Sequence, residues 1–531
     1  MACTKKNQIS SPKNEQQSHN YINKQNTFFR NLGAEPENLH PIRSTDAYAS
    51  IVQGYVLDTL LLRHRDTYEL KPHLAEKWEV DKDHTVFTFT IRSNIKWHDG
   101  RPLTVKDVAF SFHAYKDPSF GGAHFLPYLE NIKSVEVLDD KRVRFKANKK
   151  YFGNLSVLGS LAIIPEHIYK DKEKKLSRRL VGSGPYILKK YEKGKKIVLE
   201  QNKKWWGRSV KSNTHRIKRI TFRFIRDEND QLIRMAAGDF DFIGLSPEAY
   251  MKKTNTSPWG ETITKKEIQN KESSGYRYIG WNLQNPLFKD KKTRKALNYL
   301  MNRELMNKKF QYGKAKLATG PWYSWSDYAD PSIEPILFNP QKAGKLLNAA
   351  GWKDTDKNGI LDKTIQGQKK EFKFTLLFPN KDFEKYLTIY QQDLKKSGID
   401  ISLRFMDWSA FLKLLREKKF EAVTLGWSGG SVELDPKQIW HSESAREGGS
   451  NFIQYSNPEV DRLIDKGRVE MDRHKRIKIF QKVYRLIAED YPYLFLFNSP
   501  IRFYAYSKKV KMEKDTYLYD LGTRYWWLSH E

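Results

Sequence analysis

Hydrophobic residues in the C-terminal half of the chain alternate between two periods, and this alternation restricts the fold more than any other feature. Residues 371–378 form a nearly continuous apolar run, which is typical of a covered strand. Apolar residues in 382–397 recur at steps of four, three and four, as on one helix face, and 399–405 alternate as in a strand. A short helix capped by Asp407 leads to another strand over 420–425. This order predicts an α/β fold containing a parallel sheet with right-handed crossovers.

The end of the last of these strands predicts a ligand site. The strand runs into Gly426-Trp427-Ser428-Gly429-Gly430, where glycines leave the backbone accessible beside an aromatic side chain. Open sheets of this kind bind ligands beyond the carboxyl ends of their strands. Tryptophan suits such a site because it offers a broad stacking face and loses little rotamer freedom. For Trp427, and for Trp408 at the start of the preceding short helix, packing in the core remains the alternative.

The length of the chain and its single cysteine limit the remaining architecture. At 531 residues and 62.5 kDa the chain is too long for one core, and length alone suggests about three domains. The sequence contains no apolar run of about 18 residues, so we expect no membrane span. One cysteine excludes an internal disulfide framework. Cys3 precedes a polar tail, which fits a bacterial lipoprotein anchored through Cys3 by a flexible tether, a reducing compartment, or a chance residue.

The net charge of +31 and the sequence pI near 9.7 first suggest a nucleic-acid or membrane partner. However, Lys and Arg are interleaved with Asp and Glu nearly everywhere, and the sequence has neither zinc-finger spacing nor an RNP-like aromatic motif. Most of the charge therefore predicts a solvated surface. We expect no nucleic-acid partner, although a basic nucleic-acid-binding protein remains an alternative function.

The N-terminal third predicts a second kind of structure. Trp78 to Val80 and the alternating run 87–91 are separated by a polar turn, which predicts an antiparallel hairpin. Further on, Thr104 and Asp107 have the spacing of a capping box for a helix. These elements differ from the parallel pattern of the C-terminal half, which supports more than one domain.

Eight motifs, in order along the chain, resemble one family. The chain resembles the dipeptide, oligopeptide and nickel class of ABC-transporter solute-binding proteins, family 5, over about Asn26 to Leu528. Its C-terminal stretches Trp440-His-Ser-Glu-Ser-Ala and 457–464 are most similar to the branch that takes up oligopeptides and peptide-nucleotide antibiotics. The eight motifs are Leu74-Ala-Glu-Lys-Trp78, the hairpin leading to Trp97-His-Asp-Gly100, Leu103 to Phe112, Gly182-Ser-Gly-Pro-Tyr186, Asn202-Lys-Lys-Trp-Trp-Gly207, Trp281-Asn282, Arg294 to Tyr299 and Ala350-Gly-Trp352.

The resemblance implies a two-lobed periplasmic-binding-protein fold (type II, large cluster C-like) with an inserted subdomain and a hinge. It further implies a monomeric binding protein, not an enzyme, with no cofactor or metal, which delivers peptides to an ABC permease in the inner membrane. The expected location is periplasmic, either free or lipid-anchored, with the signal peptide absent from this chain. The expected divisions are a tether over 1–26, lobe I over 27–53, 181–275 and 491–531, an inserted subdomain over 54–180, and lobe II over 276–490.

The family's site carries over only in part. Trp427 matches a tryptophan that lines the ligand cleft, Gly426 and Ser428 occupy the place where main chain pairs with peptide main chain, and Trp408 matches a second aromatic residue. The family aspartate that holds the ligand ammonium stands three residues after the tryptophan, where this chain has Gly430.

A buried ammonium without a carboxylate is costly. Either Glu433 or Asp435 replaces the family aspartate, or the ligand lacks a free amine, as in N-blocked peptides, muropeptides and peptide conjugates. For Asp435, which precedes Pro436, the alternative is a helix cap.

Two competing motifs predict other chemistry. Gly426-Trp-Ser-Gly-Gly430 matches the Gly-x-Ser-x-Gly elbow of serine hydrolases, with Ser428 as nucleophile and Asp472 and His474 or His530 as partners. The elbow requires a helix directly after the serine, whereas a loop follows here as far as Pro436. Asp354 to Gly359 copies the first half of a calcium loop, but its twelfth position is Ile365 instead of glutamate, which favours a polar turn.

Overall fold

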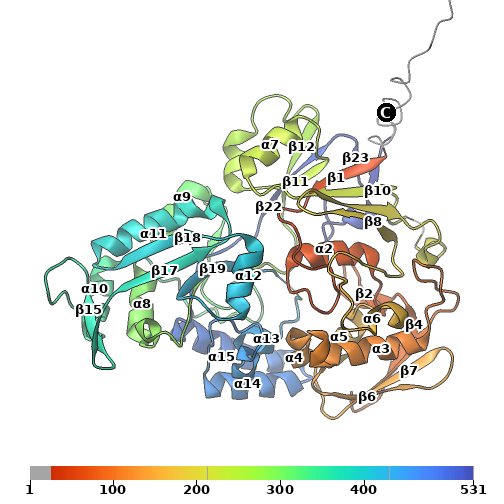
Figure 1. The fold of residues 1–531 in the computed structure, drawn as a ribbon, viewed down its shortest axis with the longest axis horizontal. Helices are drawn as coiled ribbons and strands as arrows, with labels where there is room; N and C mark the ends of the chain where they lie inside the picture. The colour runs from red at the N-terminus through yellow and green to blue at the C-terminus, as the bar shows by residue number, and fades with distance from the viewer. Residues whose placement is uncertain (1–25, 212, 430, 530–531) are drawn as a thin grey trace, which may run out of the picture.

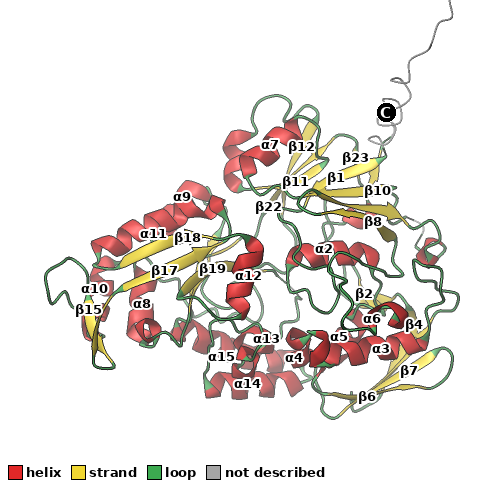
Figure 2. Cartoon of the chain, viewed as in Figure 1, coloured by secondary structure: helices red, strands yellow, loops and turns green. Residues whose placement is uncertain are grey.

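The computed structural model describes residues 26–529 except 212 and 430, so Cys3, Gly430 and His530 lie outside the described residues. The chain forms an α/β fold of two lobes, each containing a large sheet flanked by helices (Figures 1 and 2). The predicted fold class is therefore confirmed. Among the helices of the described residues, none is at once long and apolar enough to cross a bilayer.

A five-stranded sheet in the order β18-β17-β19-β13-β20 forms the centre of one lobe. Strand β17 (Lys373–Phe378) pairs in parallel with β18 (Asp400–Phe405) and with β19 (Ala422–Trp427). The helices α11 (Glu384–Lys396) and α12 (Trp408–Arg416) connect these strands. The predicted alternation and the parallel pairing are thus confirmed.

Two hydrophobic cores cover the two faces of this sheet. On one face, Leu387, Tyr390 and Leu394 of α11 pack together with residues of α8 (Lys291–Tyr299) and α10 (Pro340–Ala349). The second face is covered by α12, α14 (Pro458–Val469) and α15 (Arg473–Asp490). Because both faces of β17 are covered, this inner strand reads as a nearly continuous apolar run, whereas the edge strand β18 keeps exposed residues and alternates.

A seven-stranded sheet forms the second lobe, from segments that are far apart in sequence. Strand β1 pairs in parallel with β10, and β22 lies between β11 and β12, so the chain returns to this sheet near its C-terminus. The helices α2 (Ala47–Val56) and α7 (Glu228–Ala236) lie beside this sheet (Figure 1). In spatial order the strands are β12 (Ile263–Ile268), β22 (Arg502–Ser507), β11 (Phe242–Leu245), β1 (Thr27–Asn31), β10 (Arg219–Arg223), β9 (Lys196–Gln201) and β8 (Tyr186–Glu192).

A four-stranded antiparallel sheet with its own core lies beside the seven-stranded one. Its order is β4 (Ala75–Val80), β5 (Val86–Ile91), β7 (Arg142–Ala147) and β6 (Ile132–Val137). The β4–β5 pair is the predicted hairpin. The Asp107 carboxylate accepts a hydrogen bond from Thr104 N at 2.9 Å at the start of α3 (Val105–Lys116), as the capping box predicted. The short helices α4 (Leu126–Leu129), α5 (Asn154–Ser160) and α6 (Glu166–Tyr169) complete this part.

One expected lobe boundary falls too early. Residues 491–531 were expected in lobe I, which contains the seven-stranded sheet, but β20 (Tyr493–Phe495) pairs with β13 (Tyr276–Trp281) in the five-stranded sheet. The chain enters the other sheet only at β22. The physical reason is local: α15 ends at Asp490, and the apolar residues of β20 shortly after it are buried as a strand against β13. The other predicted lobe ranges stay predictions.

Candidate ligand-binding cleft

A cavity of about 1650 Å³ lies between the two lobes. Its lining comes from α2 and the segments near β2 (Leu61–Arg63) on one side and from β13, β19 and α12 on the other. Pockets for small molecules usually hold roughly 300–1,000 Å³. The cavity is therefore large enough for an extended ligand that touches both lobes.

The carboxyl end of β19 presents free backbone to this cavity. Gly426 pairs with Arg277 of β13, and the register of β17 with β19 ends at Val423. Arg277 O accepts from Leu496 N on the opposite side of β13, so the Arg277–Gly426 pair is not hydrogen-bonded. The N–H and C=O groups of Gly426 consequently point away from β13, along an exposed strand edge. Gly426 and Ser428 both line the cavity.

Trp427 lies where the sequence predicted it, at the edge of the cleft. Its ring stacks on Phe452 with centroids 5.6 Å apart and planes 8° apart, and its indole N–H donates to Tyr493 Oη at 3.5 Å. The residue is half-buried and lines the cavity. Trp427 therefore combines a packing contact with exposure to the cavity, and its ligand contact stays a prediction.

Trp408 also lines the cavity and joins the two lobes. It is the first residue of α12, whose cap Asp407 accepts from Ser409 N at 3.0 Å, as predicted. Its ring meets Tyr48 of α2 edge to face with centroids 5.8 Å apart. Trp408 thus contributes to the contact between the lobes as well as to the wall of the cleft.

Glu433 lines the cavity but is already occupied by cations of the protein. Its carboxylate accepts from Arg473 Nε at 2.7 Å, from a terminal nitrogen of Arg476 at 2.9 Å and from the Tyr328 hydroxyl. Burial raises the pKa of Glu433, but these hydrogen bonds outweigh burial and hold the pKa below its usual value. Two guanidinium groups already balance the charge of Glu433, so its carboxylate is not free to bind a ligand ammonium.

Asp435 is engaged in a similar way. One oxygen accepts from Lys437 N at 3.0 Å at the start of α13 (Lys437–Trp440), which agrees with the helix-cap alternative. The other accepts from Tyr151 Oη at 2.6 Å and lies 3.1 Å from Arg468 Nε. The basic partners of Glu433 and Asp435 were not predictable from the sequence, because they lie on α14 and α15 and no local pattern distinguishes them from other Lys and Arg residues.

The geometry of a serine hydrolase does not form around Ser428. Asp472 caps α15 by accepting from Lys475 N at 3.0 Å, and the described residues between Ser428 and α13 (429 and 431–436) form no helix. Within the described ranges, no hydrogen bond joins the Ser428 side chain to a histidine, while His530 lies outside them. The helix that would complete a nucleophile elbow is therefore missing at this position.

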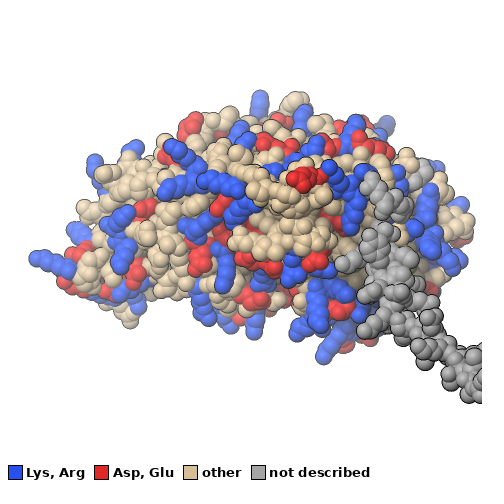
Figure 3. Space-filling model, turned by 90° about the horizontal axis from the view of Figure 1, so that it is seen from above, with Lys and Arg blue, Asp and Glu red and all other residues tan. Residues whose placement is uncertain are grey.

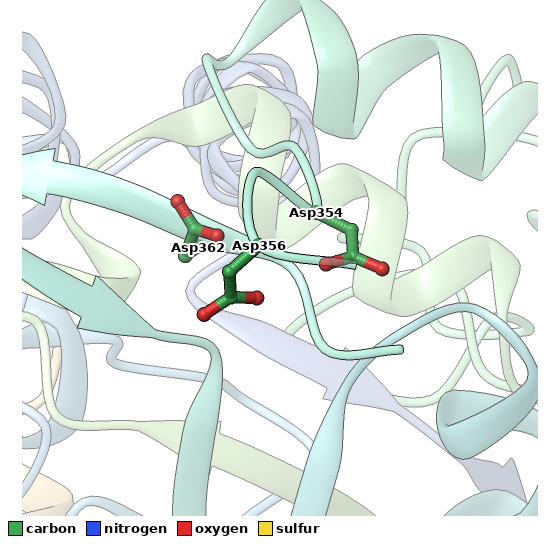
Figure 4. A group of neighbouring side chains, drawn as sticks. All are labelled: Asp354, Asp356 and Asp362. Atoms are coloured by element: carbon green, nitrogen blue, oxygen red, sulfur yellow. The ribbon is translucent and has the colours of Figure 1, made fainter. Parts of the chain in front are cut away.

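The calcium-like loop brings three carboxylates together, as Figure 4 shows for Asp354, Asp356 and Asp362. Lys369 Nζ lies 2.8 Å from Asp356 and 3.4 Å from Asp362, and backbone N–H groups of the loop donate to Asp354. The carboxylates are thus satisfied by the protein's own groups, as in a polar turn.

Charged pairs connect the two lobes. Arg416 donates two hydrogen bonds to Glu37, at 2.7 and 2.8 Å, and Arg226 lies 3.2 Å from Asp407. Lys385 of α11 pairs with Glu248 of the other lobe. These contacts hold the lobes together around the cavity. Elsewhere, on the face shown in Figure 3, basic and acidic side chains are intermixed, as expected for a solvated surface.

The comparison with known proteins decides the family. Residues 69–448 match the model of the bacterial extracellular solute-binding proteins, family 5. The chain belongs to this family. It is similar to the oligopeptide-binding protein AppA of Bacillus subtilis, with 31% identity over 93% of this chain and 90% of that protein. It is also similar to the dipeptide-binding protein of Escherichia coli, with 25% identity and 84% of each chain covered.

Solved structures of family 5 proteins share the fold. The structure of AppA from Bacillus subtilis in complex with a nonapeptide has a TM-score of 0.85 and 29% identity, and the match covers 95% of this chain and 99% of that one. The Helicobacter pylori protein DppA, in complex with the peptide STSA, has a TM-score of 0.82 at 23% identity, covering 96% and 99% of the chains. The two-lobed family 5 architecture agrees with the predicted one.

Proposed function

We propose that this protein is the substrate-binding component of an ABC importer and captures peptides or peptide-like ligands in the cleft between its lobes. The observation that carries the proposal is the free strand edge at Gly426 beside Trp427, inside a cavity that exceeds the size of small-molecule pockets. An extended peptide adds to such an edge through main-chain hydrogen bonds, which tolerate many side chains. The named relatives that bind oligopeptides and dipeptides support the same class of ligand.

Capture requires no chemical step. A ligand that contacts both lobes favours the conformation in which they touch, so binding shifts an equilibrium between open and closed forms. The Arg416–Glu37 and Lys385–Glu248 pairs belong to the closed form in this scheme. The closed, ligand-bound monomer then delivers the peptide, on the outer side of the inner membrane, to the ABC permease in that membrane. Cys3 is the proposed lipid anchor.

The ligand we favour lacks a free amine at the Gly430 position. Glu433 and Asp435 each have protein cations as partners, and a glycine stands where the family has an aspartate. N-blocked peptides, including muropeptides and peptide conjugates, place no buried ammonium there.

Calorimetric titration of matched peptides with free and acetylated N-termini tests this function. We expect the native protein to bind the acetylated peptide at least as tightly, and Gly430→Asp to gain about tenfold for the free amine alone. Gly344→Asp is the matched control, because a side chain added at Gly344 meets nothing within 4 Å and Gly344 does not line the cleft among the described residues. Unchanged binding by Gly430→Asp disproves the end-group proposal, and binding of neither peptide disproves peptide capture.

A further inference from the structure

Arg277 is an exposed guanidinium at the floor of the cleft. It is the second residue of β13, lies opposite Gly426 and lines the cavity. A Cβ atom placed on Gly426 would lie 3.5 Å from Arg277 Cγ, so the glycine leaves the arginine stem uncovered. The guanidinium lies 5.6 Å from the centroid of the Phe383 ring. The arginine therefore stands beside the proposed peptide strand edge, with an aromatic ring on one side.

Arg277 differs from the other basic residues of the cleft because, among the described residues, its guanidinium has an aromatic neighbour, Phe383, but no ion pair and no hydrogen-bond acceptor. The other four Lys and Arg side chains that line the cavity each have a fixed acceptor. These are Arg63 with Tyr68 O, Lys385 with Glu248, Arg476 with Glu433 and Arg502 with Glu272.

The acids of the cleft do not neutralise Arg277 either. Most of them are already bonded: Glu228 accepts from Ser246, and Asp46 caps α2 by accepting from Ala49 N at 2.8 Å. Asp382 also lines the cavity, but among the described residues no ion pair or hydrogen bond joins its carboxylate to Arg277. The cleft thus presents a cation that lacks a fixed counter-ion.

We propose that Arg277 binds a carboxylate of the peptide ligand, so that the cleft selects peptides carrying an acidic group at that position. The inference rests on the function proposed above and goes beyond it, because it assigns the charge of the ligand. A guanidinium binds a carboxylate through two parallel hydrogen bonds, and this pairing strengthens where an aromatic ring and a closing lobe exclude water. An acidic side chain and a C-terminal carboxylate offer the same group.

Titration with N-acetylated nonapeptides of Ala and Ser tests the inference and separates the two sources. One series carries a single Glu at each position in turn, a second carries Gln at the same positions, and both have amidated C-termini. A third peptide has a free C-terminal carboxylate. We expect the native protein to prefer one Glu peptide, or the free acid, by about 10- to 100-fold over its neutral counterpart.

Variants assign this preference to Arg277. Arg277→Gln removes the preference and leaves the affinity for the neutral peptide within about twofold. Arg404→Gln, which changes an exposed arginine of β18 outside the cavity lining, keeps the preference.

Three results overturn the inference. Equal binding of acidic and neutral peptides by the native protein shows that the cleft does not select a carboxylate, while peptide capture stands. An equal loss for both kinds of peptide in Arg277→Gln assigns Arg277 a structural role. Binding of no N-acetylated peptide in any series, together with no binding of the matched free-amine peptides, removes the proposed function as well.

Discussion

Replacing Trp427 with alanine tests the wall of the cleft and separates binding from stability. A buried tryptophan removes about 150–250 Å² from water. Trp427 is half-buried, so a ligand that covers its exposed part removes about 100 Å² more. At about 25 cal/mol per Å² this amounts to about 2.5 kcal/mol, or roughly a 70-fold increase in Kd.

The same substitution also affects folding, through the face of Trp427 that packs on the protein. Loss of the stack on Phe452, together with about 100 Å² of burial, lowers the free energy of unfolding by about 3 kcal/mol. Domains have about 5–15 kcal/mol of stability, so the variant remains folded. Calorimetric titration with an N-acetylated nonapeptide measures the affinity, and urea unfolding measures the stability.

Trp527→Ala is the control for this substitution. Trp527 of β24 (Trp527–Leu528) is also half-buried, and the centroid of its ring lies 3.8 Å from Arg216 Cζ. Among the described residues that line the cleft, Trp527 is absent. We expect it to lose stability and keep its affinity. If Trp427→Ala binds the peptide as tightly as the native protein, the assignment of Trp427 to the ligand surface is wrong.

Two further predictions concern stability. Arg468→Met removes a guanidinium from a side chain that is 3% exposed, and Asp435 and Glu130 lose their ion pairs with it. We expect urea titration to show a free energy of unfolding lower by about 3–5 kcal/mol. The control Arg462→Met, at an exposed arginine, changes the free energy of unfolding little. Equal effects of the two would contradict a buried pair. Burial raises the pKa of Asp46 from 3.8 to about 6, so the folded state binds more protons between those values and stability falls as pH rises from 4 to 6. Asp46→Asn, which keeps the helix cap, therefore raises the free energy of unfolding by up to about 3 kcal/mol at pH 7.5 and by under about 1 kcal/mol at pH 4. Equal increases at the two pH values would refute the raised pKa of Asp46.

Hydrophobic period was sufficient to predict the elements that carry Trp408 and Trp427 on one side of the cleft. The strand expected over 420–425 is Ala422–Trp427, and the helix expected after Asp407 is Trp408–Arg416. These elements follow from local spacing, because a strand covered on both faces and a helix with one buried face leave different patterns. The placement of Gly426 and Trp427 at a strand end follows from the same reasoning.

The electrostatics of the cleft were not predictable in this way. The ion pairs of Glu433 and Asp435 join distant elements, and a chain with 94 Lys and Arg residues offers many equivalent partners. Arg277 left one signal: it is the single charged residue in the strand Tyr276–Trp281, whose other members are apolar or aromatic apart from Gly280. That signal identifies an unusual position, but only strand pairing brings Arg277 beside Gly426.

Native mass spectrometry of the protein mixed with a pool of N-acetylated nonapeptides tests the central claim most directly. The account predicts a noncovalent complex of one peptide per chain, release of that peptide at its original mass, and a weaker complex for Trp427→Ala. A spectrum that shows only the free protein, or released peptides that have been cleaved, would contradict capture of an unaltered peptide between the lobes.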